Sequence, residues 1–494
     1  MTADRPSPGS RSGAPLHPNV VLIVLDCARA KNFSMSGGGR VAATPVLDAL
    51  AERGTSFPRA VAPSNWTLPS HISMFTGKYP NEHGIRTYQL GEKLPETTAE
   101  FLRAEGFETA MFTENVQLIG KFGLQNGFDF VYYKGRQKGL TNVFGVKRGR
   151  FGLAYSPALV HVLGRLPPLI APLAWTTRRQ EVVFKRAMCT PVILDRFETW
   201  LAGRTSDRPF YTFFNFLDTH EPYQLDDRPG ALGILDRTYL YAPRSHLLLV
   251  PGLQSHLRWE ALVGGYVRSI EDADRKVGQL LEILKRRGLL ESTMVIVTSD
   301  HGQAFGEMGN VYHAAGATDS VTRVPLIVAP PPDIPVPRRV NRWVSLCEID
   351  SWIRSAAAGQ APFDSDGRAL PPFSGIAPDT GVVYCEGPPV SDANRSMRNL
   401  GADQFWGHRL LAAYRGDEKY VLDTNTGEVL TWEQARDPDV TPPNRLTGEG
   451  AGLVRRDVFE TYEAKDASRL ARLSPQTSGV DLEIDSRLRS WGYD

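Results

Sequence analysis

Residues 19–27, NVVLIVLDC, constrain the fold more strongly than any other segment of this 494-residue chain. An unbroken run of aliphatic, largely β-branched residues is typical of a central parallel strand that is covered on both faces. The run ends in Asp26, so a carboxylate stands at the carboxyl end of the predicted strand. Because α/β proteins bind ligands at this edge of the sheet, we expect Asp26 to belong to a functional site.

Further strands and helices alternate along the chain after this first strand. Thr44 and Pro45 are a typical start for a helix, and that helix should end at Gly54. The remaining elements are predicted as a helix at 94–107, strands at 108–115 and 209–220, a helix at 259–287 and a strand at 293–302. This alternation predicts an α/β fold with a large, mostly parallel central sheet.

Three further regions divide the chain. Residues 1–18 are polar and rich in Pro, Ser and Gly, which predicts a disordered leader before a catalytic α/β domain at 19–371. After residue 371, short β-like runs at 381–387, 409–415 and 418–424 alternate with turns. We therefore expect a C-terminal subdomain at 372–494, with a small antiparallel sheet, a helix over 457–473 and a charged tail.

Residues 134–186 interrupt the alternation and form a predicted cap insertion over the active-site edge. This segment has eleven Lys and Arg residues against the single acid Glu181, and it encloses the apolar piece PALVHVLGRLPPLIAPLAW. Two interpretations stay open. The apolar face packs on the catalytic domain, or the segment is a surface for an anionic or lipid-like substrate and contacts a membrane surface.

Composition excludes several classes of protein. A formal charge of +1 gives no overall attraction to nucleic acid, and no stretch reaches the roughly 18 apolar residues that a membrane span needs. The four cysteines lack C-x-x-C spacing, which favours reduced, buried thiols. These features predict a cytoplasmic protein, and they leave its oligomeric state open.

The residues that can carry chemistry follow predicted strands. Asp26, His220 and the Asp300-His301 pair all stand at carboxyl ends, and buried carboxylates of this kind need a partner such as a divalent cation. Thr67 precedes a helix-like run, so its hydroxyl should lie near a helix N-terminus, where an anionic group is favoured. A metal-activated threonine there would be a nucleophile.

Several motifs over 19–331 resemble the sulfatase-like branch of the alkaline phosphatase superfamily: LIVLDxxR, TPVLDALAERG, WTLPSHISMFTGKYPNEHG, DTHEPY, YVRSIEDADRKVGQLLEILKRRGLLESTMVIVTSDHG and RVPLIVAPP. This resemblance implies an alkaline-phosphatase-like three-layer sandwich. It further implies that Asp26, Asp300 and His301 are metal ligands and that Thr67 occupies the nucleophile position. By the same resemblance His71, His220 and His313 contact the anionic head of the substrate or its leaving group.

The departures from the sulfatase pattern bear on mechanism. Sulfatases oxidise a Cys or Ser at the position of Thr67 to formylglycine, and a threonine cannot yield that aldehyde. Cys27 stands where many sulfatases have a second metal-binding Asp, and His71 replaces the Arg of C-x-P-S-R. The Asp300-His301 pair instead resembles phosphate-processing relatives. Arg29 either neutralises charge and binds substrate or braces its loop.

The sequence therefore predicts a metal-dependent hydrolase that cleaves an anionic ester through Thr67, without formylglycine. Phosphate mono- and diesters or phosphonates are the favoured substrates, and transfer to an acceptor hydroxyl stays open. The alternatives are a sulfuric ester hydrolase and a catalytically silent member that binds an anion or a partner. One divalent cation, Mn²⁺, Mg²⁺ or Ca²⁺ with Zn²⁺ also open, is expected at Asp26, Thr67, Asp300 and His301.

Overall fold

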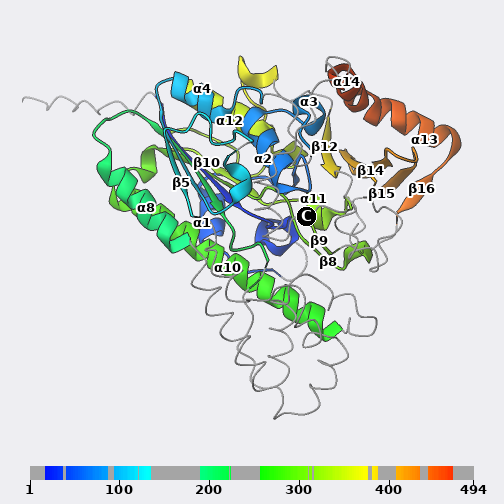
Figure 1. Cartoon of the computed structure of the whole chain (residues 1–494), viewed down its shortest axis with the longest axis horizontal. Coiled ribbons are helices and arrows are strands. Elements are labelled where there is room, and N and C mark those ends of the chain that lie inside the picture. Colours follow the sequence, from blue (N-terminus) through cyan, green and yellow to red (C-terminus); the bar gives the residue numbers. More distant parts are fainter. Residues whose placement is uncertain are drawn as a thin grey trace, which may run out of the picture.

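A large sheet forms the centre of the molecule (Figure 1). The computed structural model describes residues 17–36, 41–86, 94–120, 122–134, 190–221, 223, 256–309, 311–313, 316–375, 381–387, 408–433 and 443–470. Within them the sheet has the strand order β2 (Thr55–Ser56), β10 (Leu326–Ala329), β7 (Thr293–Thr298), β1 (Asn19–Leu25), β6 (Phe210–Phe216), β4 (Glu108–Thr113) and β5 (Phe130–Tyr133). Only β10 runs antiparallel to its neighbours β7 and β2, which confirms the mostly parallel sheet.

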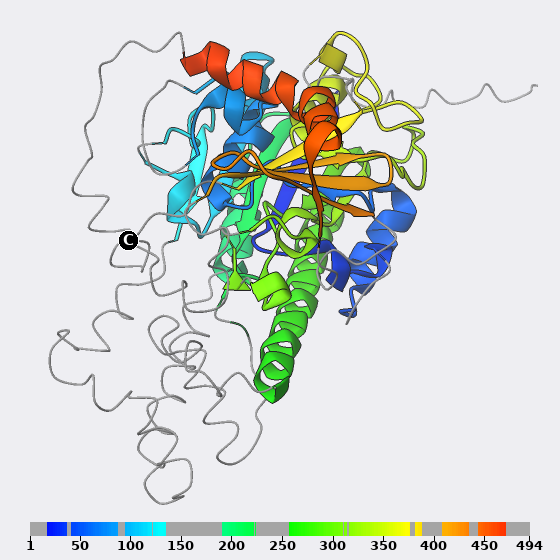
Figure 2. The ribbon, with the colours of Figure 1, turned by 90° about the vertical axis from the view of Figure 1, so that its right-hand side faces the viewer.

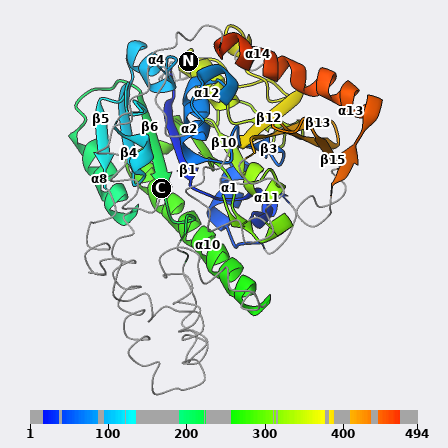
Figure 3. The same ribbon diagram turned by 45° about the vertical axis from the view of Figure 1, so that its right-hand side comes forward.

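Strand β1 shows why the fold has three layers. Its side chains alternate between two apolar cores: Val20, Leu22 and Val24 pack into one, while Val21, Ile23 and Leu25 pack into the other. Helices α2 (Thr67–Thr76), α4 (Thr98–Ala104) and α12 (Glu348–Ala357) cover the first face, and α1 (Pro45–Arg53), α8 (Thr190–Gly203) and α10 (His256–Arg286) cover the second (Figures 1 and 3). The sheet is therefore buried on both sides, as its continuous apolar strands require.

The long helix α10 closely matches the helix that the sequence predicts at 259–287. Its buried stripe repeats at three- and four-residue steps through Tyr266, Ile270, Ala273, Val277, Leu280 and Leu284. Leu281 lies at the edge of the stripe and is only partly buried. Full burial of one such aliphatic side chain stabilises the fold by about 1.5–3 kcal/mol, so this stripe fixes α10 against the sheet.

A second sheet, entirely antiparallel, crosses the front of Figure 2. It consists of β12 (Val382–Gly387), β13 (Leu410–Arg415), β14 (Glu418–Asp423), β15 (Val429–Glu433) and β16 (Asn444–Leu446), in that order. One face packs on Tyr79 and on the helical segment that contains Val458 and Tyr462, while the other packs on Val61 and Trp343. The small C-terminal sheet that the sequence predicts is thus confirmed.

A buried ion pair joins this sheet to the short helix α11 (Asp319–Thr322). Lys419 Nζ in β14 lies 2.8 Å from Asp319 Oδ1, which also accepts a hydrogen bond of 2.8 Å from the Tyr414 hydroxyl. Burial alone would raise the pKa of Asp319, but the positive charges of Lys419 and Arg323 outweigh it and hold that pKa below its usual value. Asp319 is therefore ionised, and its charge is matched by the buried ammonium.

The remaining elements are short. They are β3 (Ala60–Val61) with β11 (Val344–Ser345), β8 (Ala304–Phe305) with β9 (Val311–Tyr312), α3 (Pro80–His83), α13 (Gly448–Val454), a π-helical turn at Arg455–Phe459, α14 (Glu460–Leu470), and 3-10 turns at Ala30–Asn32, Ser34–Ser36, Val116–Leu118, Leu290–Ser292, Glu307–Gly309 and Phe373–Gly375. The helix predicted at 457–473 is thus part of a longer, interrupted helical segment.

Several predictions concern residues that the structure does not describe. The 134–186 insertion, apart from Lys134, and the leader, apart from its last two residues, lie outside the described ranges. The domain limits, the cytoplasmic location and any membrane contact of the insertion stay predictions. Among the helices that the structure does describe, none is both long enough and apolar enough to span a membrane.

Candidate active site

Four neighbouring strands, β7, β1, β6 and β4, bring polar side chains to one edge of the sheet. Asp26 follows β1, and its Oδ2 accepts hydrogen bonds from Nδ2 of Asn115 (3.0 Å), just beyond β4, and from Nδ2 of Asn215 (3.2 Å) in β6. Burial alone would raise the pKa of Asp26. The nearby His220, His301 and His71 imidazoles and the Asn215 hydrogen bond outweigh burial and lower this pKa to about 2. Asp26 is therefore a fully buried carboxylate.

The second carboxylate, Asp300, follows β7 and has two differently placed oxygens. Its Oδ1 accepts backbone hydrogen bonds from Cys27 (3.1 Å) and His301 (3.0 Å). Its Oδ2 is buried, lies 3.4 Å from His301 Nε2, and has no hydrogen-bond partner among the described residues. An unsatisfied buried carboxylate oxygen next to the His301 imidazole fits a divalent cation, because such burial is otherwise costly.

Thr67 is the first residue of α2, and its side chain faces the Asp300-His301 pair. Its Oγ1 lies 3.1 Å from His301 Nε2, and the residue is only 3% exposed. The other ring nitrogen of His301, Nδ1, lies 2.9 Å from the Gly302 carbonyl oxygen. Since a carbonyl only accepts, we assign the proton to Nδ1, which leaves the Nε2 lone pair to accept from the Thr67 hydroxyl.

Two side chains of α2 fix Thr67 against the end of β7. The Ser70 hydroxyl donates a 2.6 Å hydrogen bond to the Asp300 carbonyl oxygen. His71 Nδ1 lies 2.8 Å from the Thr67 carbonyl oxygen and 3.6 Å from Asp300 Oδ2. The His71 ring is completely buried and packs edge-on against Phe75 and Phe213. The described contacts of His71 thus hold Thr67 and Asp300, and its contact with substrate stays a prediction.

Gly302 controls the loop that carries His301. Its backbone N–H donates to the Val321 carbonyl (2.9 Å), which brings the loop against α11. A Cβ at this position would lie 2.0 Å from the Ser320 carbonyl oxygen and 3.1 Å from Cβ of Arg29. Glycine is therefore required here by a close backbone approach.

His220 and His313 lie on the outer side of the carboxylates. His220 follows β6 and is 6% exposed, and its ring centroid is 5.2 Å from that of His313, which follows β9. The His313 ring is also 4.6 Å from the His301 ring. Burial, together with the neighbouring His301 and His220, lowers the pKa of His313 well below its usual value, so this imidazole is neutral. Both predicted histidines are thus brought to the site.

Arg29 points to a different set of partners. Its guanidinium contacts Asn32 Oδ1 (2.5 Å), the Gln303 carbonyl oxygen (3.2 Å) and Glu307 Oε1 (2.6 Å), and it lies 4.7 Å from the ring centroid of Phe305. These contacts brace the loops after β1 and β7. Its predicted role in substrate binding stays a prediction.

Sequence reasoning missed Ser70, Asn115, Asn215 and Glu221 as members of the site. Asn215 carried a usable signal, because it is the only strongly polar residue in the apolar strand FYTFFNF, at the end where ligands bind. Ser70 carried none, since its partner Asp300 is 230 residues away in sequence. Asp218, two residues before His220, forms an ion pair with Lys276 of α10.

A three-layer α/β fold with carboxylates, imidazoles and a hydroxyl at the carboxyl edge of its sheet defines an alkaline-phosphatase-like protein. The Sulfatase family model matches residues 18–350, and the chain belongs to this family.

Relatives of known activity are about a quarter identical to this chain over the aligned residues. The chain is 27% identical over 329 residues to the ulvan-active sulfatase of Formosa agariphila, covering 64% of this chain and 57% of that protein. It is 27% identical over 424 residues to the steryl-sulfatase of Mus musculus, covering 74% of this chain and 66% of that protein. The chain thus spans less than two thirds of the length of either relative.

Solved structures support the same fold. The phosphonate monoester hydrolase of Agrobacterium radiobacter aligns with a TM-score of 0.56 and 20% identity, covering 92% of this chain and 94% of that one. A protein solved in complex with its substrate D-glucosamine-2-N,6-O-disulfate aligns with a TM-score of 0.61 and 16% identity, covering 92% of this chain and 99% of that one. At these identities the likeness shows the fold.

Proposed function

We propose that this chain is a metal-dependent hydrolase that cleaves an anionic ester with Thr67 as its nucleophile, and that phosphate monoesters, phosphate diesters or phosphonates are its favoured substrates. The observation that carries this proposal is the 3.1 Å contact between Thr67 Oγ1 and His301 Nε2, beside the buried Asp300 carboxylate. Membership of the sulfatase family supports ester hydrolysis. The preference for phosphorus rests on the unmodified threonine and on the Asp300-His301 pair.

Asp26, Thr67, Asp300 and His301 are the residues that would hold one divalent cation. Three of them offer oxygen atoms and one offers an imidazole nitrogen, a set that suits Mn²⁺, Mg²⁺ or Ca²⁺ and is also compatible with Zn²⁺. Such a cation supplies Lewis-acid stabilisation to a threonine alkoxide and to the ester oxygens. The unsatisfied Oδ2 of Asp300 supports this assignment.

The side chains then divide the reaction between them. Thr67 Oγ1 releases its proton to water and forms a bond to phosphorus while the bond to the leaving oxygen breaks, and the leaving oxygen takes a proton from His220. His313 would be the donor in its place only after it had itself taken up a proton, which a bound anionic substrate would favour. Water then attacks the phosphothreonine, releases the anion and restores the hydroxyl; an acceptor alcohol in place of water would make the protein a transferase. Through its bond to the Thr67 carbonyl, His71 holds the nucleophile in place.

A sulfuric ester hydrolase is the second candidate, because the relatives of this chain include the ulvan-active sulfatase and steryl-sulfatase. The same attack by Thr67 would then take place at sulfur. A formylglycine hydrate has no part in either version, since threonine cannot give the aldehyde.

The test is a metal analysis of the purified chain, paired with turnover of matched nitrophenyl sulfate, phosphate monoester, phosphate diester and phosphonate substrates. We expect cleavage that a chelator abolishes and that is fastest on a phosphorus ester. Preference for the sulfate would instead establish the second candidate. Absence of both bound metal and turnover would contradict both and favour a silent anion- or partner-binding protein.

Variants of Thr67 test the nucleophile itself. Thr67→Ala should lower kcat/KM by at least about 10³-fold, because loss of a nucleophile removes the covalent route, whereas Thr67→Ser keeps a hydroxyl and measurable turnover. Thr76→Ala is the matched control, since Thr76 is buried in the same helix and its hydroxyl donates 2.7 Å to the Ile72 carbonyl. Equal activity of folded Thr67→Ala and Thr76→Ala would rule out Thr67 as the nucleophile.

A further inference from the structure

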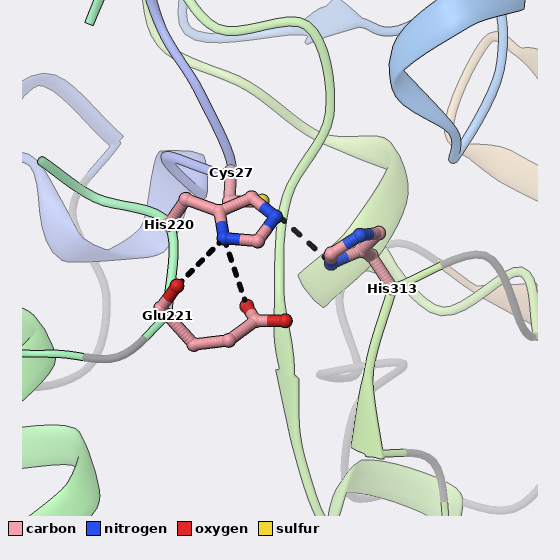
Figure 4. Close-up of side chains that lie close together, drawn as sticks. All are labelled: Cys27, His220, Glu221 and His313. Atoms are coloured by element: carbon pink, nitrogen blue, oxygen red, sulfur yellow. Dashed lines mark hydrogen bonds and ion pairs between the residues drawn. The ribbon is translucent and has the colours of Figure 1, made fainter. Parts of the chain in front are cut away.

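A second group of metal-ligating side chains adjoins the carboxylates described above. It consists of Cys27, which follows Asp26; His220 and Glu221, which follow β6; and His313, which follows β9. Each residue offers one ligand atom, and these atoms all lie within 4.8 Å of one another. Figure 4 shows the His220 ring lying between the Glu221 carboxylate and His313, with the Cys27 sulfur behind that ring.

The side chains of this group point toward one another. Cys27 Sγ lies 3.6 Å from His313 Nδ1, and His220 Nδ1 lies 3.6 Å from Glu221 Oε2. Cys27 and His220 are buried, whereas Glu221 and His313 are partly exposed. The group is therefore closed on its inner side and accessible on its outer side.

The backbone of Cys27 is held in an unusual conformation that fixes its thiol in this group. Its φ is 67°, in the left-handed region that non-glycine residues rarely adopt. The backbone N–H donates to Asp300 Oδ1 (3.1 Å), and the carbonyl accepts from the Tyr266 hydroxyl (2.7 Å). Such a conformation persists only where the surroundings impose it, and it is enriched at ligand sites.

One amide orients two of the four side chains. Gln303 Oε1 lies 2.9 Å from His313 Nδ1, and Gln303 Nε2 donates to Glu221 Oε2 (3.0 Å) and to the Tyr223 hydroxyl (2.5 Å). Partners of this kind, which fix the direction of imidazole and carboxylate ligands, accompany metal sites in general. The contact of Gln303 with Glu221 is therefore a second feature that points to a bound cation, whereas at His313 Gln303 contacts Nδ1, the nitrogen that faces Cys27 Sγ, and a cation bound there would replace Gln303.

We propose that Cys27, His220, Glu221 and His313 bind a second cation of the thiophilic, borderline class, represented by Zn²⁺ and Co²⁺. One sulfur, two imidazoles and one carboxylate match the tetrahedral ligand sets of this class, whereas Mg²⁺ and Ca²⁺ prefer oxygen alone. This cation is additional to the one proposed at Asp26, Thr67, Asp300 and His301, and its binding does not depend on Thr67 acting as a nucleophile. While His220 and His313 hold it, neither would protonate the leaving oxygen, and the cation would stabilise the charge on that oxygen in place of the proton.

Cobalt is the probe that tests this site without any assay of turnover. The full-length chain, freed of metal, is titrated with Co²⁺ while absorbance and bound metal are measured. We expect two equivalents per chain and a near-ultraviolet charge-transfer band from a cobalt-bound thiolate. Cys27→Ser should abolish the band and weaken one equivalent more than about tenfold. Cys385→Ser is the control, since Cys385 is equally buried but lies in β12 of the second sheet.

Two further variants separate this site from the proposed catalytic cation. Thr67→Ala should keep the charge-transfer band, whereas His313→Ala and Glu221→Gln should weaken the equivalent that produces it. Circular dichroism and thermal melting verify that each variant is folded. The proposal is overturned if the wild-type chain gives no band, if the band survives Cys27→Ser, or if folded His313→Ala binds Co²⁺ as the wild type does. None of these results depends on which ester is cleaved.

Discussion

Thr67 Oγ1 and His301 Nε2 lie 3.1 Å apart, although 234 residues separate them in the sequence. One belongs to the first turn of a helix on one face of the sheet, and the other follows a central strand. Their separation is therefore set by how α2 packs against the end of β7, so residues that hold this packing should affect turnover as well as the reacting groups.

Ser70 is the first such residue. Ser70→Ala removes the 2.6 Å hydrogen bond to the Asp300 carbonyl, and we expect a stability loss of about 1–3 kcal/mol with a fall in kcat that exceeds any change in KM. The measurement is steady-state kinetics beside urea unfolding. Ser73→Ala is the control, because Ser73 is buried one turn away and bonds His83 Nε2 (3.0 Å). If both variants lose stability and activity alike, Ser70 has only a structural role.

Asn215 should act through Asp26. Its amide donates 3.2 Å to Asp26 Oδ2, so Asn215→Ala removes one of the two amides that orient this oxygen, the other being Asn115, and should weaken cation binding about 10–100-fold. Competition with a chromogenic chelator measures the affinity directly. Asn81→Ala should leave affinity unchanged, since the buried Asn81 amide instead donates to the Tyr462 carbonyl (2.8 Å). Unaltered affinity in folded Asn215→Ala would contradict the role of Asn215 in orienting Asp26.

Gly302→Ala should impair catalysis because it displaces the loop that carries His301. The added Cβ would meet the Ser320 carbonyl at 2.0 Å, so the loop that carries His301 must move. Displacement of a reacting group by about 1 Å lowers rates about 10²-fold, and that is the loss expected in kcat/KM. Gly203→Ala is the control, because no atom lies within 4 Å of a Cβ added there. Full activity of Gly302→Ala would show that the loop adapts without moving His301.

The Asp319–Lys419 pair should give stability a specific dependence on pH. The pKa of Asp319 is lowered in the folded protein, so the stability it contributes is present above its unfolded pKa of about 3.9 and is lost as pH falls through the folded value. Lys419→Met removes the closer of the two cations that face the buried Asp319 carboxylate and leaves Arg323 at 3.4 Å, so it should lower the unfolding free energy at pH 7 by at most about 3–5 kcal/mol.

This difference between Lys419→Met and the wild type should shrink as pH falls, because protonation of Asp319 removes the buried charge that Lys419 no longer compensates. Chemical unfolding between pH 7 and pH 4 measures it. Arg286→Met, which breaks an exposed pair with Glu198, should change stability by less than about 1 kcal/mol at every pH. A deficit in Lys419→Met that is constant across this range would contradict the assignment of charge to Asp319.

Much of the fold was predictable, because its central strands are continuous apolar runs and α10 has a clear helical stripe. The same runs end in Asp26 and in Asp300-His301, which is why the strand ends could be identified as candidate ligands. Because α/β proteins bind ligands at the carboxyl ends of their strands, the sequence identifies the candidate ligands that directly follow these strands.

The remaining features depend on contacts that no local pattern encodes. The left-handed φ of Cys27 arises from hydrogen bonds to Asp300 and Tyr266, both more than 200 residues away. The burial of His71 against Phe75 and Phe213 depends on how α2 meets β6. A motif locates such a residue in the sequence, but the direction of its side chain follows only from packing.

Gly302 has a wider consequence for how this site can change over time. It has no side chain and offers no functional group, yet the space behind it sets where His301 stands. A mutational survey confined to ionisable or nucleophilic residues would overlook it. Because the opposing wall is the Ser320 backbone carbonyl, which every residue at position 320 would keep, the close approach depends on the glycine alone.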